Sequence, residues 1–366
     1  MNKLLSAIVI LVLSFSLSAQ AGSHSKSKTL KIQLTFPETS YDGQIVKMWT
    51  DRVTKLTRGE LKFELLSVGE VVGMKETIEA VDKGLVDGGA AWTHYWSNYH
   101  PAAMLFGSPV AGGGIGLSTK SWLAWYFDNG GKELYDRLWD EMGMNVKGFV
   151  MASSGPEALG WFKEPITSMD DFRKYRFRTP PGIPGQTYKD IGVASVSMGG
   201  GDILPALEKG TIDAAEWCCP KPDSVFGFQK VLKNYYLQGL HQNVVNGDIY
   251  INGDVYNSLT DDQKYAMEVA SEAMITRNIT NRAVENGKAL IDLTQNHGVK
   301  LWDTPADYFT EYMNAAQATL AKNAAENAFF KEVYDHMTEH AKIVVPFIAQ
   351  METSDASIGT AFAKHQ

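Results

Sequence analysis

Cysteine is nearly absent from this chain of 366 residues: only Cys218 and Cys219 occur, and they are adjacent. Neighbouring cysteines cannot cross-link distant segments, and a disulfide between the two would be strained. Structural zinc sites need spaced cysteine pairs, which the sequence does not contain. The sequence therefore excludes a disulfide-stapled fold and a cysteine zinc site. We interpret the two thiols as small side chains packed near a pocket, with a strained vicinal disulfide as the alternative.

Basic clusters are also missing, and the formal net charge is −8 at pH 7. Proteins that bind nucleic acid neutralise phosphates with blocks of lysine and arginine. We therefore expect no nucleic acid among the partners. Because the overall field repels anions, any anionic ligand must be held by a local group of donors.

Long apolar runs are missing beyond the amino terminus. There, Lys3 precedes an apolar run over residues 4–17, and Ala19-Gln20-Ala21 matches a small-x-small cleavage site. The run is too short to span a bilayer comfortably. We predict a cleaved signal peptide over residues 1–21 and export to the periplasm, with an uncleaved anchor as the alternative.

The remaining residues alternate between strand and helix patterns. Strands are predicted over 29–36, 61–68 and 145–151, and helices over 45–56 and 76–83. This alternation is typical of α/β lobes with mostly parallel sheets. The length favours two domains over one.

The last third of the sequence is helical. Thr260 and Gln263 form a capping-box pattern that opens a long helix over about 265–295. Its apolar residues form a stripe, as expected for a helix that lies across a surface. Further helices are predicted over 305–327 and 329–348.

Two stretches of the chain share one pattern. Each has a helix, a Lys-Gly break, an Asp, small residues and a Trp, over residues 80–92 and 206–217. Glycine at the break suits a left-handed helix C-cap. Two similar units suggest two lobes with a cleft between them. No low-complexity linker separates them, so we expect crossing strands to join the lobes.

Three charged residues in the middle of the chain are candidates for an anion site. Glu157 and Glu216 have apolar or aromatic neighbours, and Arg178 lies at a strand end before two prolines. The planar fork of arginine matches a carboxylate bidentately. Each residue alone is better explained as an exposed salt-bridge partner. His336 and His340 are four residues apart, but without a third ligand we interpret them as a solvated helix face.

The segments 177–180 and 206–217 carry a family resemblance, through Phe-Arg-Thr-Pro and Gly-x-x-Asp-Ala-x-Glu-Trp. The chain resembles the periplasmic solute-binding component of a tripartite ATP-independent periplasmic (TRAP) transporter. It is most similar to the branch that binds 2-oxo and 2-hydroxy monocarboxylates through a metal ion. The resemblance implies a two-lobed α/β periplasmic binding protein fold with crossing hinge strands and a long bracing helix. We place lobe I at 22–152 plus 244–282, and lobe II at 153–243 plus 283–366.

The resemblance also implies the site residues. The family arginine that binds the substrate carboxylate falls on Arg178, and a substrate-contacting tyrosine falls on Tyr95, with His94 beside it. Glu157 and Trp217 complete the expected substrate contacts. The ion is expected to bind the carboxylates of Glu157 and Glu216 and the backbone carbonyl of Trp217.

Glu157 stands where family members often carry an amide, and this affects the ion. Two glutamates, Arg178 and a monocarboxylate leave a formal charge of −2, which a divalent cation cancels. Oxygen ligands in an extracytoplasmic setting favour calcium, with sodium as the alternative. Without the cation, two carboxylates would repel the incoming anion, so ion and substrate should bind cooperatively.

The function that we expect is capture of a small organic acid, such as pyruvate or lactate, for delivery to a TRAP membrane permease. A secreted metal-dependent hydrolase using Glu157 and Glu216 is the alternative, although no nucleophile elbow or zinc motif supports it. A sensor that reports the ligand to a membrane partner is a third interpretation. The helices after residue 305 resemble those through which some family members form homodimers.

Overall fold

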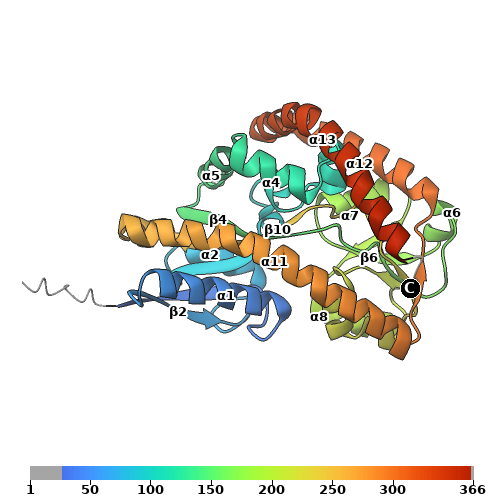
Figure 1. Cartoon of the computed structure of the whole chain (residues 1–366), viewed down its shortest axis with the longest axis horizontal. Helices are drawn as coiled ribbons and strands as arrows, with labels where there is room; N and C mark the ends of the chain where they lie inside the picture. The colour runs from blue at the N-terminus through green and yellow to red at the C-terminus, as the bar shows by residue number, and fades with distance from the viewer. Residues whose placement is uncertain (1–26, 364–366) are drawn as a thin grey trace, which may run out of the picture.

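The computed structural model describes residues 27–363 and contains two β-sheets flanked by helices (Figure 1). The first sheet has the order β2-β1-β3-β10-β4 and the second β11-β9-β5-β8-β6-β7. The strands of the first sheet are β1 (Lys28–Leu34), β2 (Leu61–Leu66), β3 (Gly88–Trp92), β4 (Val146–Ser154) and β10 (Val245–Asn252). Those of the second are β5 (Gly160–Phe162), β6 (Arg176–Thr179), β7 (Ala194–Ser197), β8 (Ala214–Ala215), β9 (Asn234–Tyr236) and β11 (Lys300–Trp302).

The helices pack around these sheets, and strands alternate with helices over residues 28–92 as the sequence predicts (Figure 1). They are α1 (Tyr41–Leu56), α2 (Thr77–Asp82), α3 (Ala103–Gly107), α4 (Thr119–Asp128), α5 (Gly131–Glu141), α6 (Met169–Phe172), α7 (Ile183–Asp190), α8 (Gly200–Glu208), α9 (Pro220–Phe226), α10 (Gly253–Asn257), α11 (Asp261–Asn296), α12 (Ala306–Glu326) and α13 (Ala328–Ala363). Short 3-10 turns are η1 (Met74–Glu76), η2 (Thr93–Trp96), η3 (Val110–Gly114) and η4 (Phe228–Lys230).

The chain passes between the two sheets three times, twice along short segments and once through α11, which leads from β10 to β11. Residues 155–159 connect β4 of the first sheet to β5 of the second, and residues 237–244 connect β9 back to β10. Both return strands run antiparallel to their neighbours: β10 to β3 and β4, and β5 to β8 and β9. The described sheets are therefore mostly parallel, as the sequence predicts, and each contains one antiparallel strand, the one that enters along a short segment from the other sheet.

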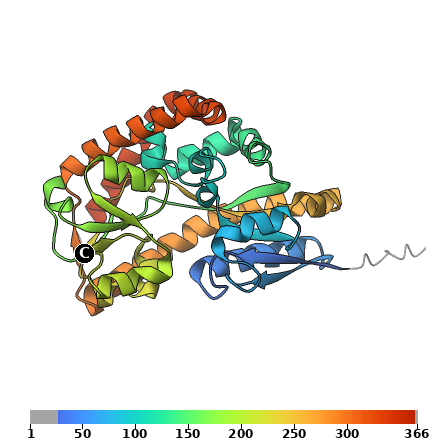
Figure 2. The same ribbon diagram turned by 180° about the vertical axis from the view of Figure 1, so that it is seen from behind.

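Helix α11 braces both parts of the molecule. Its capping box is present as predicted, with Thr260 and Gln263 bonded to each other's backbone. Along its 36 residues the helix packs against α1 and β4 at one end and against α9 toward the other. Figure 2 shows it running past both sheets from behind. The predicted long helix is confirmed.

The repeated pattern forms two equivalent turns. Gly84 follows α2 with φ of 68°, and Gly210 follows α8 with φ of 67°. These left-handed conformations are accessible to glycine at little cost. Each turn leads into an inner strand of a different sheet, β3 or β8. The similarity of the two units in sequence therefore reflects a similarity of position.

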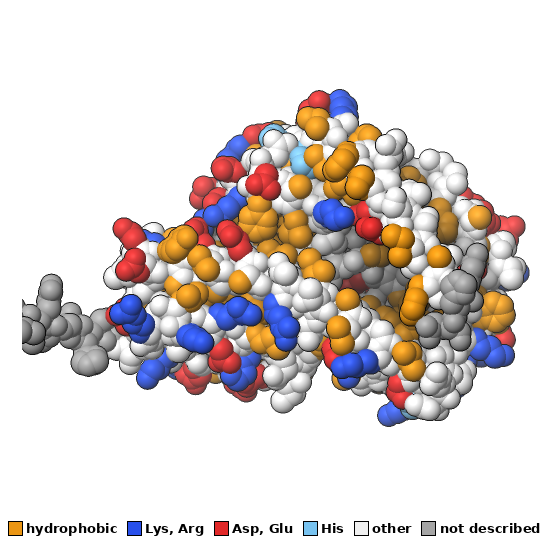
Figure 3. All heavy atoms as spheres, in the orientation of Figure 1, with side chains coloured by type: hydrophobic (Ala, Val, Ile, Leu, Met, Phe, Trp, Pro, Cys, Tyr) orange, Lys and Arg blue, Asp and Glu red, His pale blue; other side chains and the backbone are white. Residues whose placement is uncertain are grey.

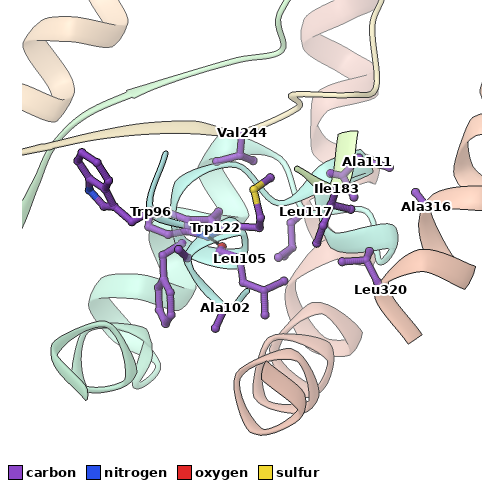
Figure 4. Packing of buried hydrophobic residues seen from close by; sticks show 14 of the residues in the cluster. Trp96, Ala102, Leu105, Ala111, Leu117, Trp122, Ile183, Val244, Ala316 and Leu320 are labelled. Atoms are coloured by element: carbon purple, nitrogen blue, oxygen red, sulfur yellow. Dashed lines mark hydrogen bonds between the residues drawn. The ribbon is translucent and has the colours of Figure 1, made fainter. Parts of the chain in front are cut away.

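The carboxy-terminal helices pack against both parts of the molecule. Helix α12 lies on η3 and α7, and α13 lies on α3, α4 and α5. Leu117, Ile183 and Leu320 gather in one buried cluster in Figure 4. Helix α13 extends to residue 363, well beyond the predicted end at 348. The exact lobe boundaries stay a prediction.

Among the described residues, no helix combines the length and the apolar character needed to cross a membrane. The predicted signal peptide, residues 1–21, lies outside the described residues. On the face seen in Figure 3, acidic and basic side chains are interspersed, and hydrophobic ones follow α13.

Candidate functional site

Three of the predicted site residues meet where the crossing segments approach the second sheet. Arg178 lies in β6 and pairs in register with Ala215 of β8, so Glu216 follows directly beside it. Glu157 lies on the crossing segment between β4 and β5. Only 6% of Glu157, 5% of Arg178 and none of Glu216 is exposed to solvent. The interpretation as exposed salt-bridge partners is therefore wrong for all three.

The guanidinium of Arg178 is bound closely to Glu216. Its Nη1 donates to the Glu216 carboxylate oxygen Oε1 at 2.5 Å and to the Glu216 backbone carbonyl at 2.9 Å. Its Nε and Nη2 donate to the carbonyl of Met198 at 3.2 and 3.0 Å. The group also lies over the ring of Trp217, 5.3 Å from the centroid. These contacts fix a positive charge at the end of β6.

A cluster of potential metal ligands is adjacent to this pair. Glu157, Glu216 and His241 each offer a ligand atom, and these atoms lie within 4.8 Å of one another. Within the described part of the chain, Glu157 Oε2, Glu216 Oε2 and His241 Nε2 are buried without a hydrogen-bond partner. Buried carboxylate oxygens are normally paired, because leaving them unpaired is costly. A cation would satisfy the two carboxylate oxygens, so Glu157 and Glu216 fit a metal ion.

The electrostatics of the two glutamates differ. Burial, and then the nearby charge of Glu216, raises the pKa of the Glu157 carboxyl well above its usual range. Burial also raises the pKa of Glu216, but Arg178 and then His241 outweigh it, so the net shift is downward. Arg178 therefore favours the charged form of Glu216, whereas burial and the charge of Glu216 favour the neutral form of Glu157.

His241 was not predicted from the sequence. It lies on the crossing segment before β10 and is completely buried. Its Nδ1 is 3.2 Å from the Tyr188 hydroxyl, which is 3.2 Å from the Tyr308 hydroxyl. These contacts turn Nε2 toward Glu216 Oε2, at 3.6 Å. A lone histidine in an otherwise unremarkable segment gave no spacing signal that could have identified it.

The predicted tyrosine and histidine of η2 lie near the same charges. Tyr95 is half-buried, and burial raises its pKa, with Arg178 opposing the shift and Asp42, Glu157 and Glu216 adding to it. The rings of His94 and Tyr95 meet edge to face at 5.0 Å. Burial lowers the pKa of His94 to about 4, so His94 is neutral at physiological pH. The charges of Arg178 and Glu216 thus act on Tyr95, and that of Glu216 acts on His94.

Trp217 forms part of the wall of the site. Its ring packs on Phe226 with the centroids 4.6 Å apart. A side chain at Gly200 would come within 2.8 Å of this ring, so glycine is required for the close approach. The next carbonyl, that of Cys218, accepts a hydrogen bond from Ala158 at 2.8 Å. Coordination of an ion by the Trp217 carbonyl stays a prediction.

The two cysteines are free and buried, as the pocket interpretation predicts. Their backbone N–H groups both donate to Asp223 Oδ1, at 3.0 and 3.1 Å. They line a cavity of about 260 Å³ together with Glu157 and Arg282. Arg282 was not singled out from the sequence, because its position depends on packing of α11 against distant segments.

The interpretation of the two α13 histidines as a solvated face is wrong for His340. This residue is buried, with Nε2 3.0 Å from the Ser121 carbonyl and Nδ1 3.0 Å from the Asn129 side chain. His336 accepts a hydrogen bond from the Trp125 indole at 2.9 Å. The two histidines attach α13 to α4.

Comparison with known proteins places this geometry in a family. The model of bacterial extracellular solute-binding proteins, family 7, matches residues 33–327. The monocarboxylate 2-oxoacid-binding periplasmic protein of a Nostoc species is 32% identical over 291 residues, which cover 78% of this chain and 76% of that protein.

Solved structures of TRAP solute-binding proteins also match this chain. A TRAP transporter solute-binding protein of Bordetella bronchiseptica, a mixed-occupancy dimer with copurified calcium and picolinate bound in one active site, matches with a TM-score of 0.85 and 25% identity. The match covers 93% of this chain and 99% of that one. A TRAP periplasmic solute-binding protein of Pseudoalteromonas atlantica, with bound sodium and pyruvate, matches with a TM-score of 0.83 and 22% identity, over 91% and 99% of the two chains.

Proposed function

This chain belongs to family 7 of the bacterial extracellular solute-binding proteins, and we propose that it captures a 2-oxo or 2-hydroxy monocarboxylate together with a cation. Pyruvate and lactate are the acids of this class that we propose as its ligands. The observation that carries the proposal is the pair of buried, unpartnered carboxylate oxygens of Glu157 and Glu216 beside Arg178. The family consists of solute receptors, which confirms the expected binding role and removes the hydrolase alternative.

The cation and the acid divide the charges of the site between them. A cation held by the carboxylates of Glu157 and Glu216 would neutralise the charge that now engages Arg178. The guanidinium would then be able to pair bidentately with the carboxylate of the acid. Tyr95 and His94 would contact the acid from the other side of the cleft, and Trp217 would form the wall beside it.

Calcium is the cation that we propose, with sodium as the alternative. The two glutamates, Arg178 and the acid together carry a formal charge of −2. The nearby ion pair of Asp42 and Arg282 has no net charge, so it does not change this sum. A divalent ion cancels that charge. Irregular sites of carboxylate and carbonyl oxygens suit calcium better than magnesium, which requires near-octahedral geometry.

We further propose delivery of the acid to TRAP permease subunits in the periplasm, after removal of residues 1–21. A homodimer through α13 is supported by a row of exposed apolar side chains on that helix. These side chains are each at least 57% exposed. The row consists of Ile343, Phe347, Met351, Ile358 and Phe362. An apolar stripe of this kind is more typical of an interface than of a free helix surface.

Calorimetry with pyruvate and lactate, in the presence of calcium or of a chelator, tests the proposal. We expect binding in calcium that is strongly weakened by the chelator. Native mass spectrometry of gently purified protein would identify a copurified acid directly. The proposal would be overturned by a protein that binds neither acid in calcium and carries no 2-oxo or 2-hydroxy acid after purification.

A further inference from the structure

Helix α11 carries a polar stripe in the middle of its packed face. The stripe consists of Asn278, Asn281, Arg282 and Asn286. The last three lie three, four and eight residues after the first, which places all four on one side of a helix. Asn278 donates to the Ser153 carbonyl near the end of β4 at 2.8 Å. Asn286 accepts from the Lys221 backbone at the start of α9, at 3.0 Å.

Arg282 makes the most extensive contacts of this stripe. Its Nη2 donates to Asp42 Oδ1 at 3.0 Å, and its Nη1 lies 3.2 Å from the sulfur of Cys218 and 3.4 Å from that of Cys219. The guanidinium also lies over the ring of Tyr41, 4.9 Å from the centroid. Arg282 itself is only 7% exposed.

The partners of this one guanidinium belong to different parts of the molecule. Asp42 lies in the first turn of α1, which connects β1 and β2 of the first sheet. Cys218 and Cys219 directly follow Trp217 after β8 of the second sheet. We call these parts the first-sheet half and the second-sheet half. Arg282 therefore touches both halves beside the proposed binding site.

We propose that Arg282 is a closure latch: its guanidinium contacts Asp42 on one side and the thiols of Cys218 and Cys219 on the other, and so holds the two halves together over a bound acid and slows release of the acid. The proposal rests on the proposed function. Arg282 acts here as a positioning residue, because its donors face Asp42 and the thiols, whereas Arg178 carries the charge beside Glu216.

Stability alone does not account for this pair. Buried ion pairs lose much of their attraction to desolvation, so they contribute little compared with apolar packing. The Asp42 side chain remains 24% exposed, so it can return to water when the halves separate. A contact of this kind favours the closed state only, and its loss should change the rate of opening.

Stopped-flow fluorescence of the tryptophans, with pyruvate and saturating calcium, tests the latch in full-length mature protein. The variants are Asp42→Asn, Arg282→Gln and both together. We expect release about 5- to 50-fold faster, with association changed less than about threefold, because effects of this kind appear mainly in dissociation. The double variant should release pyruvate no faster than the faster single variant, since both remove one interaction.

Glu268→Gln is the matched control. It removes an ion pair of α11 with Lys132 of α5, at 3.1 Å, which lies entirely within the first-sheet half. It should leave release unchanged. Unchanged release in Asp42→Asn, additive effects in the double variant, or an effect on association alone would each overturn the latch. If Arg282→Gln fails to fold, the rate of pyruvate release from Asp42→Asn alone tests the latch.

A second measurement separates the latch from the proposed function. A wild-type protein that did not bind pyruvate or lactate in calorimetry would contradict the proposed function. The latch is then tested with the compound that native mass spectrometry identifies in the purified protein. Asp42→Asn should release this compound faster than Glu268→Gln does, and equal release rates would overturn the latch.

Discussion

Arg178 donates to both the side chain and the backbone of Glu216, at 2.5 and 2.9 Å, in a pocket where neither residue is more than 5% exposed. The two residues that we expect to bind the acid and the cation are thus each other's partners. A buried charge without a partner of opposite sign is energetically unfavourable. Removal of either residue would therefore leave the other as an uncompensated buried charge. Acid and cation should therefore bind together. The cation draws Glu216 away from Arg178, and the carboxylate of the acid then neutralises the charge of Arg178.

Arg178→Lys should weaken acid binding by about 2–5 kcal/mol, because the bidentate fork is lost and a buried anion is left poorly paired. Calorimetry with pyruvate in calcium measures this. Arg176→Lys is the control, since Arg176 lies two residues away on the same strand and pairs with Asp213 in solvent at 2.8 Å. Nearly wild-type affinity in Arg178→Lys would remove this residue from the site.

Asp223 should make stability depend on pH. Burial raises its pKa to about 7, although Trp161 and Tyr235 donate to Oδ2 at 2.8 and 2.9 Å. A carboxyl whose pKa is higher in the folded state stabilises most when protonated. Its contribution is complete below the unfolded pKa of about 4 and is lost as the pH rises through about 7.

The measurement is urea unfolding of the wild type and Asp223→Asn between pH 4 and 8. The stability of the wild type relative to the variant should fall by up to about 4 kcal/mol as the pH rises. Asp202→Asn, at an exposed position in the first turn of α8, should show no such trend. A difference that is constant with pH would show that Asp223 is ionised throughout.

The sequence supported the parts of the fold that have local signals. The capping box at Thr260 fixed the start of α11, and the glycines at 84 and 210 marked two left-handed turns. The one antiparallel strand in each mostly parallel sheet was not predictable, because the direction of β5 and β10 depends on where each segment crosses between the sheets. Such crossings are properties of the whole chain.

The site residues also fall into those with a local sequence signal and those without one. Arg178 and Glu216 belong to segments with recognisable patterns, and the structure places them in direct contact. His241 and Arg282 contribute single side chains from a crossing segment and a long helix, where no spacing marks them. Their roles depend on contacts between residues far apart in sequence. Geometry alone could identify them.

Closure of the two halves should follow ligand binding. Segments 155–159 and 237–244 join the halves, so rotation about them would open the cleft without disrupting either sheet. Small-angle scattering should show a smaller radius of gyration with pyruvate and calcium than without them. Chelated protein with pyruvate is the control and should remain open. Identical profiles in all conditions would indicate a rigid pocket.

The cation should determine whether the acid binds at all. Chelator-treated protein should lose most of the thermal stabilisation that pyruvate gives, because stabilisation follows binding to the folded state. Calcium should restore it better than magnesium. By linkage, pyruvate must tighten calcium binding by the same factor as calcium tightens pyruvate binding.

Glu157→Gln tests the charge argument behind that prediction. The Glu157 carboxyl has a raised pKa from burial and from Glu216, so it ionises at the cost of a proton when calcium binds. Glutamine keeps an oxygen ligand but removes one formal charge, which should shift the preference from calcium toward sodium. Titrations with each ion in the presence of pyruvate measure the shift. Glu164→Gln, which lies beyond β5 outside the cluster, is the control. Stripped wild-type protein that binds pyruvate as tightly as untreated protein would show that Arg178 holds the acid without a metal.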